Sequence, residues 1–308
     1  MVYHMVTNST PNTCATAFSS SASILFSPLF SFLTQTAFIN SMVFSQPANR
    51  NVLDFFSLRG KVVAITGGSR GIGLELSRGF AEAGADVANI YASSANSDAV
   101  AEEIRDTYGV RSKAYQADVA NAEQVEGAIK QIVNDLGKLD VMVVNAGICT
   151  HVDSLDCTPE GWKHIQDVNV NGAFFTSQAA ARVFKGQGYG NIIVIASISA
   201  HLVNRPQTQT SYNTSKAAVM HMTKCLAAEW ASLNIRVNSI SPGYISTDMT
   251  KMGIDEDPAM FNEWMRHTPA GRMAQPYELK GLAVFLASDA SSYMTGSDII
   301  VDGGYTVW

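Results

Sequence analysis

From Leu58 onward the sequence alternates short apolar runs with longer amphipathic segments, and this alternation constrains the fold more than any other feature. Lys61–Thr66 (KVVAIT) and Asn191–Ala196 (NIIVIA) are typical of strands buried on both faces. Strands that alternate with helices of 10–20 residues pair in parallel, because each helix carries the chain back across the sheet. We therefore predict an α/β fold over residues 51–308, with a doubly wound parallel sheet flanked by helices.

The same pattern places the individual elements. The predicted strands are Lys61–Thr66, Asp86–Tyr91, Ser112–Gln116, Val141–Val144, Asn191–Ala196, Arg236–Ser241 and Asp298–Val301. The predicted helices are Leu74–Ala83, Ala99–Thr107, Glu123–Asp135, a long helix within Pro159–Ala181, Ser211–Ala231 and Tyr277–Ala287. Asp248–Gln275 is predicted to be a long polar loop, a length that in compact domains usually has a function.

Residues 1–50 differ in composition from the rest of the chain. They are rich in Ser, Thr, Ala and Phe, contain no Asp or Glu, and have Arg50 as their only basic residue besides histidine. Their apolar stretch, Ile24–Leu33, is far shorter than the roughly 20 residues of a membrane span. We predict that this extension is mostly disordered and that the protein is cytoplasmic. Alternatives are a mitochondrial presequence, although these are normally rich in Arg, and a translation start at Met42.

Charge and cysteine usage exclude several classes of function. The net charge is −6 and no run of Lys or Arg is present, so a nucleic-acid partner is not expected. The four cysteines lie far apart without a CxxC pair or a histidine cluster, which argues against a disulfide framework and against a metal site. A reducing compartment and a small-molecule partner are expected instead.

A glycine-rich turn, Thr66–Gly73 (TGGSRGIG), follows the first predicted strand and precedes the first predicted helix. Glycines at this junction let the backbone approach a pyrophosphate, whose charge is stabilised by the N–H groups at the helix start. The candidate cofactor-binding residues in the turn are Gly67, Ser69, Arg70, Gly71, Ile72 and Gly73. A glycine motif between a strand and a helix predicts a dinucleotide site.

The end of the second strand favours NADP(H) over NAD(H). NAD-binding sites usually place Asp or Glu there to bind the ribose 2′-hydroxyl, whereas this strand ends Tyr91-Ala92-Ser93-Ser94, with no acid before Asp98. Arg70 and Ser93 are candidates to bind a 2′-phosphate instead. The alternative for Arg70 is an ordinary surface arginine.

Ser197, Tyr212 and Lys216 have a spacing that suits carbonyl reduction. Tyr212 and Lys216 are four residues apart, so on a helix they leave the same face. We expect the ammonium group of Lys216 to lower the pKa of the Tyr212 phenol toward neutrality. Ser197 follows a buried strand, and its hydroxyl could bond the substrate carbonyl. By itself, Tyr-x-x-x-Lys also describes an ordinary solvated helix face.

Together these motifs resemble the short-chain dehydrogenase/reductase family over residues 58–308. Further motifs that carry the resemblance are Asp118-Val119, Asn145-Ala146-Gly147, Asn169-Val170-Asn171-Gly172 and Pro242-Gly243. The resemblance implies a Rossmann fold and an NADP(H)-dependent oxidoreductase that interconverts a ketone and a secondary alcohol. It implies that the catalytic residues are Asn169, Ser197, Tyr212 and Lys216. It further implies that the cofactor site includes Asp118, Val119, Asn145, Tyr212, Lys216, Pro242, Gly243, Ile245 and Thr247. Turn or cap chemistry is the alternative for Asn145 and Asn169.

Within this family, Val203–Gln207 and Ser241–Ile245 are similar to fungal NADP-dependent mannitol dehydrogenases and to sorbose or xylulose reductases. This similarity implies a polyol or ketose substrate. The alternatives are a tailoring reductase for polyketides or terpenoids in fungal secondary metabolism, and a catalytically silent NADP-binding scaffold. The family also implies a homo-oligomer, either a dimer or a homotetramer.

The substrate pocket is expected to involve three segments, Cys149–His151, His201–Asn204 and Met249–Met273. The last contains Met252, Met260, Phe261, Trp264 and Met265. These residues are expected either to pack within a lid over the site or to contact an apolar substrate. Trp264 is the residue that we expect to affect substrate choice with little effect on stability.

Overall fold

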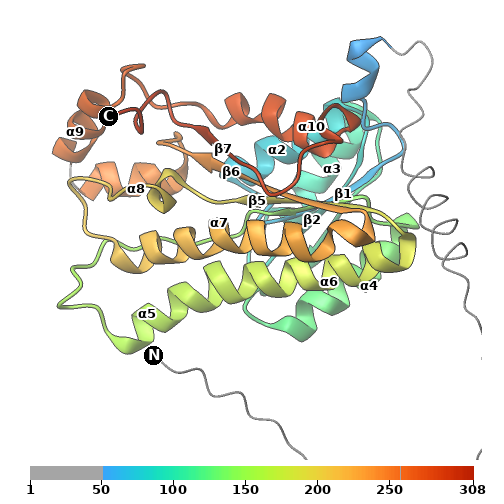
Figure 1. Cartoon of the computed structure of the whole chain (residues 1–308), viewed down its shortest axis with the longest axis horizontal. Helices are drawn as coiled ribbons and strands as arrows, with labels where there is room; N and C mark the ends of the chain where they lie inside the picture. Colours follow the sequence, from blue (N-terminus) through green and yellow to red (C-terminus); the bar gives the residue numbers. More distant parts are fainter. Residues whose placement is uncertain (1–50, 257) are drawn as a thin grey trace, which may run out of the picture. The chain divides into compact units, whose positions relative to one another are not determined.

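Seven parallel strands form the central sheet of the computed structural model, which describes residues 51–256 and 258–308 (Figure 1). The strands are β1 (Val62–Thr66), β2 (Asp86–Tyr91), β3 (Ser112–Gln116), β4 (Val141–Val144), β5 (Gly190–Ile195), β6 (Ile235–Pro242) and β7 (Asp298–Val301). Their order across the sheet is β3-β2-β1-β4-β5-β6-β7, and every pair is parallel. The order reverses direction between β1 and β4, which is where doubly wound sheets bind their ligands.

Helices cover both faces of the sheet (Figure 1). One layer contains α4 (Ala122–Leu136), α6 (Gly172–Gln187) and α7 (Thr210–Trp230), and the other contains α2 (Gly71–Glu82), α3 (Ser97–Tyr108) and α10 (Lys280–Ala287). Further helices are α5 (Pro159–Gln166), α8 (Asp248–Glu256) and α9 (Pro258–His267). Short helical turns lie at η1 (Val52–Phe56), η2 (Asp167–Asn171), η3 (Ile198–Ala200), η4 (Ala231–Leu233), η5 (Pro276–Leu279) and η6 (Asp289–Ser291).

The helical layers on both faces of the sheet explain why the strands are continuous apolar runs in the sequence. Within β1, Val62 and Ala64 pack against the layer of α4, α6 and α7, whereas Val63 and Ile65 pack against α2, α3 and α10. Alternate residues of a strand point to opposite faces, so both sets must be apolar when both faces are covered. All five residues of β1, including Thr66, are buried.

The predicted α/β fold with a parallel Rossmann-type sheet is confirmed, and β2, β3, β4 and β7 have the predicted bounds. The helix expected within residues 159–181 is present as α5 and α6, joined by the π-helical turn η2. The prediction that Asp248–Gln275 is a long loop is wrong in part, because the segment contains α8 and α9. Pro258 at the start of α9 has the backbone angle that suits a first helical turn.

The segments that follow β1, β4, β5 and β6 lie at the carboxyl edge of the sheet. Figure 1 shows α8 and α9 at the same end of the molecule as the start of α7. The extension predicted for residues 1–50 lies outside the described residues. Among the residues that are described, no helix is long and apolar enough to cross a membrane.

Candidate active site

The glycine turn after β1 has the geometry of a phosphate cradle. Gly67 and Gly71 have φ values of 68° and 54°, a region that side chains disfavour. At Gly73 there is no room for a side chain, because a Cβ atom would lie 2.1 Å from the carbonyl oxygen of Gly67. Arg70 precedes α2 without capping it through its side chain. The backbone can therefore approach a pyrophosphate closely, at a helix end that favours negative charge.

Asn145 holds this turn from the end of β4. Its Nδ2 donates to the carbonyl oxygens of Thr66 (2.8 Å) and Gly67 (3.3 Å). In return, Thr66 Oγ1 accepts from the main-chain N–H groups of Asn145 and Ala146, both at 3.0 Å. The bonds tie β1 to β4 where the strand order reverses, so Asn145 supports the shape of the turn rather than capping a helix.

Arg70 and Ser93, the residues expected to bind a 2′-phosphate, are both exposed. Ser69 is buried, and its hydroxyl lies 2.6 Å from that of Ser97 at the start of α3. This contact joins the glycine turn to the segment after β2. β2 ends at Tyr91 and is followed in the sequence by Ala92, Ser93 and Ser94, none of which is acidic.

The other expected cofactor residues outside α7 come from the loops after β3 and β6. Asp118 is exposed, and one of its carboxylate oxygens accepts from the N–H of Ala120 at 3.0 Å. Val119 is buried against Gly172, where a Cβ atom would lie 2.8 Å from Val119 Cγ2.

At the end of β6, Pro242 is buried, and the N–H of Gly243 donates to the carbonyl of Val301 at 2.9 Å. Ile245 is also buried, and Ile72 packs at the edge of the same apolar cluster. Thr247 lies beside the glycine turn, because a Cβ atom on Gly71 would be 3.5 Å from its methyl group.

Tyr212 lies in the first turns of α7 and interacts with Ser197. Ser197 is buried at the end of β5, where its hydroxyl accepts from the N–H of Ser199 at 3.1 Å. Burial raises the pKa of Tyr212 well above its ordinary value, and the hydrogen bond with Ser197 only partly opposes this. The expected lowering of the Tyr212 pKa by Lys216 is therefore wrong for the protein without cofactor, because burial is the largest influence on this pKa and the nearby thiol of Cys149 acts in the same direction.

Lys216 extends under the ring of Tyr212. Its Nζ lies 5.6 Å from the centre of the ring and donates to the carbonyl of Ile195 at 2.9 Å. Only 6% of the residue is exposed, and burial lowers the pKa of its ammonium group to about 8. Two of its three protons remain for other acceptors, such as a ribose hydroxyl.

Asn169 lies in the π-helical turn between α5 and α6, beside the same helix. Its Oδ1 accepts from the N–H of Ile148, and its Nδ2 donates to the carbonyl of Ile148 and to Ser215 Oγ, all at 2.9 Å. Ser215 in turn donates to the carbonyl of Tyr212 at 2.7 Å. Because its side chain is occupied in this way, Asn169 links the loop after β4 to the helix turn that carries Tyr212.

Two buried polar residues were missed by the sequence analysis. Ser215 bridges Asn169 and Tyr212. Its position in the sequence between Tyr212 and Lys216 could have identified it as part of the site. Asn89, in the middle of the apolar strand β2, accepts from Ser77 Oγ at 2.7 Å and lies directly under Gly68. A polar residue in a buried strand needs a partner, so its position was also a signal.

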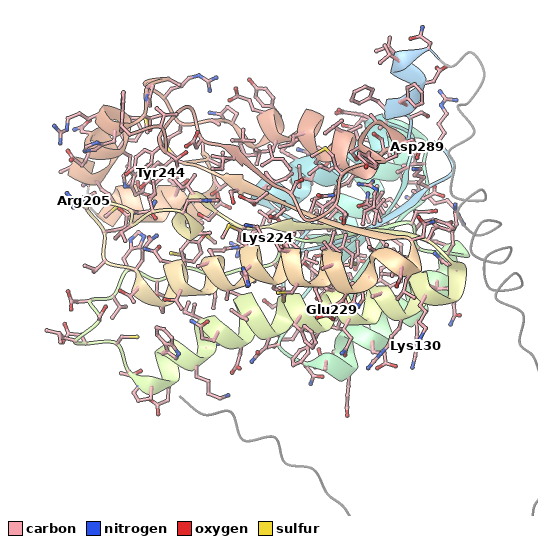
Figure 2. All side chains as sticks on the ribbon, in the orientation of Figure 1. Lys130, Arg205, Lys224, Glu229, Tyr244 and Asp289 are labelled. Carbon is pink, nitrogen blue, oxygen red and sulfur yellow. The ribbon has the colours of Figure 1, made fainter. Side chains whose placement is uncertain are left out.

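Trp264 does not face the site as a free lid residue. It is 2% exposed, its ring stacks on that of Tyr244 with centroids 4.2 Å apart, and its Nε1 donates to Gln207 at 2.9 Å. Figure 2 labels Tyr244 and Arg205 at the end of the molecule where α8 and α9 lie. Of the two roles considered for the apolar residues of this segment, Trp264 therefore has the packing role.

Some of the other residues expected in the substrate pocket form hydrogen bonds within the protein. His201 Nε2 lies 2.8 Å from a carboxylate oxygen of Asp298, and Asn204 is buried against Ser199 and Tyr244. Cys149 is partly buried close to Tyr212 and Lys216. The structure thus brings Ser197, Tyr212, Lys216 and Cys149 together at the carboxyl edge of the sheet.

The glycine turn lies where the strand order reverses, and Ser197, Tyr212 and Lys216 lie at the same edge of the sheet, an arrangement that a nucleotide-dependent oxidoreductase could use. The chain belongs to the short-chain dehydrogenase/reductase family, as expected from its motifs. Residues 67–306 match a model of this family that is described as enoyl-(acyl carrier protein) reductase.

Curated relatives and solved structures agree with this assignment. The chain is 47% identical over 259 residues to a probable NADP-dependent mannitol dehydrogenase of Yarrowia lipolytica, covering 83% of this chain and 91% of that protein. It is 46% identical to the sorbose reductase SOU1 of Candida albicans, with coverage of 83% and 90%. The NADPH-dependent 3-quinuclidinone reductase of Rhodotorula rubra has a TM-score of 0.81 at 40% identity, with coverage of 87% and 99%.

Proposed function

We propose that this protein is an NADP(H)-dependent oxidoreductase that interconverts a polyol and a 2-ketose. Its membership of the family makes it an oxidoreductase acting on CH–OH and C=O groups. NADP(H) is the cofactor, in agreement with the relatives and with a β2 that ends without an acid. The single observation that supports a polyol or ketose is the 46–47% identity to mannitol dehydrogenase and sorbose reductase over most of both chains.

In the direction of reduction, Ser197 and Tyr212 would bond the carbonyl oxygen, where negative charge develops in the transition state. NADPH supplies the hydride when it is bound. Because burial raises the pKa of Tyr212, the phenol keeps its proton at neutral pH until negative charge develops on the carbonyl oxygen that it bonds. Ser197, already positioned by its bond to Ser199, would orient the same oxygen toward Tyr212.

Lys216 and Asn169 would complete the path for the proton. Lys216 has free donors for the ribose and lies under the Tyr212 ring. The side chain of Asn169 is already bonded to Ile148 and Ser215, so a water in a proton relay would bond its main chain instead. We expect the π-helical turn to present that backbone, because such turns alter the regular hydrogen-bond ladder.

A second candidate is a reductase for a bulky cyclic ketone. The observation that favours it is the 40% identity to a 3-quinuclidinone reductase over 87% of this chain. The tailoring of secondary metabolites would be one use of such an activity. That role, the homo-oligomeric state and the cytoplasmic location remain predictions from the sequence.

A panel of ketones with purified protein separates the two candidates. We expect NADPH oxidation with fructose, sorbose or xylulose at a higher kcat/KM than with 3-quinuclidinone or other alicyclic ketones. NADH should be used less well at equal concentration. A clear preference for alicyclic ketones would favour the second candidate, and no turnover with any ketone would contradict both.

Tyr212→Phe tests the proton donor in the same assay. The change removes the hydroxyl and keeps the ring, so kcat should fall by a factor on the order of 10³ while the protein stays folded. NADPH binding, followed by its fluorescence, should be nearly unchanged. Retention of most activity would show that another group supplies the proton.

A further inference from the structure

Gln209 is a buried carboxamide three residues before Tyr212, and it borders the catalytic residues from the start of α7. It is 5% exposed and occupies the position immediately before the helix. Its Nε2 donates to Asn213 Oδ1 at 2.8 Å and lies 3.3 Å from both Ser199 Oγ and Asn204 Oδ1. Because three acceptors surround the amino group, the orientation of the carboxamide is determined.

The oxygen of the same carboxamide has a much weaker partner. Its donor is the thiol of Cys149, with Sγ 3.8 Å from Gln209 Oε1. Thiols are weak donors, and burial raises the pKa of this one to about 12, so it remains a neutral S–H group. A buried carbonyl loses its bonds to water and gains little from such a donor. Gln209 Oε1 therefore retains the capacity to accept a strong hydrogen bond.

The position of Cys149 places this oxygen beside the reacting groups. The loop that carries Cys149 contacts Lys216, because a Cβ atom on Gly147, two residues before Cys149, would lie 3.5 Å from Lys216 Nζ. The thiol itself is only partly buried. A molecule bonded to Tyr212 would thus meet Cys149 and, next to it, the oxygen of Gln209. At this place the carbonyl oxygen of Gln209 would accept a hydrogen bond from an O–H group of that molecule.

We propose that Gln209 Oε1 accepts a hydrogen bond from a hydroxyl group next to the substrate carbonyl and so selects α-hydroxy ketones over plain ketones. This inference rests on the proposed function, because 2-ketoses are α-hydroxy ketones and their polyol products keep the hydroxyl. A plain ketone leaves Gln209 with only the thiol. Sites that bond a substrate hydroxyl discriminate strongly against analogues without it.

A neighbouring carboxamide provides a matched control. Gln207 is also buried, but its Oε1 accepts from Trp264 Nε1 at 2.9 Å and its Nε2 lies 3.3 Å from the hydroxyl of Tyr244. Both ends of Gln207 therefore have strong partners within the protein. Gln207→Met should lower stability without changing the preference for hydroxylated ketones.

The test compares 2-hydroxycyclohexanone with cyclohexanone, which differ by one hydroxyl next to the carbonyl. With NADPH, the wild-type ratio of kcat/KM should favour the hydroxylated ketone by about ten- to a hundredfold. Gln209→Met should bring the ratio close to one, with unchanged NADPH affinity, and Gln207→Met should keep the wild-type ratio. A Gln209→Met protein that keeps the wild-type ratio would overturn the inference and leave the proposed function intact.

Cys149→Ala provides a second route if Gln209→Met does not fold, since it leaves the carboxamide network in place. Removing the thiol takes away the only donor recorded for Gln209 Oε1 among the described residues, so the ratio should rise by a factor of about two to ten. A ratio equal to or below that of the wild type would overturn the inference. If the wild type reduces neither sorbose nor either cyclic ketone, the proposed function fails, and the inference fails with it.

Discussion

Lys216 carries an ammonium group into the interior, where it donates a hydrogen bond to the Ile195 carbonyl, and no acid among the described residues compensates its burial. Its pKa falls to about 8 from an ordinary value of 10.5, and a difference of this size corresponds to a cost on the order of 3 kcal/mol for the charged form. Active sites commonly contain groups that reduce the stability of the fold. Lys216 is such a group in this protein.

Lys216→Met should therefore stabilise the cofactor-free protein while it removes activity. At pH 7 the free energy of unfolding should rise by about 1–2 kcal/mol, because the lost bond to Ile195 offsets part of the gain. Between pH 8 and 10.5 the unfolded chain binds more protons at Lys216 than the folded one, so wild-type stability rises with pH and the difference shrinks.

Chemical denaturation of both proteins at pH 7 and pH 10 measures this difference. Other lysines and tyrosines titrate in the same range, but they are common to both proteins and cancel in the comparison. A variant that is less stable than the wild type at pH 7 would show that the buried charge carries no such cost.

Arg70→Ala should weaken NADPH binding by about ten- to a hundredfold and leave NADH binding nearly unchanged. Only NADPH has the 2′-phosphate, and a guanidinium forms strong charge-assisted bonds with it. Fluorescence titration of both cofactors measures the effect. Arg105→Ala, at an exposed site on α3, is the control and should affect neither cofactor. Equal losses for the two cofactors would remove Arg70 from the phosphate site.

At the scale of elements, Trp264 packs α9 against the body of the protein. Trp264 stacks on Tyr244, and Tyr244 contacts Tyr305 near the carboxyl terminus at 5.3 Å between ring centres. Met260 lies one turn before Trp264 and is also buried. The helix therefore packs as a regular element beside the site, and its motion would require the separation of these rings.

Trp264→Ala should lower the free energy of unfolding by about 3–5 kcal/mol, because it leaves a large cavity and an unpaired Gln207 oxygen. Phe261→Ala on the same helix is the control and should cost less than about 1 kcal/mol, since Phe261 is 36% exposed. Thermal and chemical denaturation measure both. If the two variants lose similar stability, the buried position of Trp264 does not anchor α9.

At the scale of the whole molecule, parallel pairing brings distant parts of the chain to one edge of the sheet. The glycine turn follows β1, Asn145 follows β4, Ser197 follows β5 and Thr247 follows β6. These four segments span more than half of the sequence, yet Thr247 lies beside Gly71. The described residues contain all seven strands of this sheet and the helices on both of its faces.

A chain that begins at Asn51 should therefore fold and remain active. Residues 1–50 have no apolar periodicity typical of a packed element, and each face of the sheet already has its helices. Its melting temperature should lie within about 2 °C of the full chain, with the same kcat/KM for the preferred ketone. A large loss of either would show that the extension stabilises the folded part.

The sequence by itself determined the fold class, the bounds of four strands and the family to which the chain belongs. Apolar periodicity reports local burial, so β2, β3, β4 and β7 could be placed without a structure. The order of the glycine turn, Asn169, Ser197, Tyr212 and Lys216 along the chain likewise identified the family. These features depend on residues close together in sequence or on motifs of fixed spacing.

Only the tertiary structure decided how the site residues are surrounded. Burial raises the pKa of Tyr212, where the sequence had predicted that Lys216 would lower it. Trp264 is a packing residue because Tyr244 and Gln207 lie against it, and the oxygen of Gln209 meets the thiol of Cys149, which is 60 positions away in the sequence. Hydration and hydrogen-bond partners depend on groups that are distant in sequence, and a local pattern does not contain them.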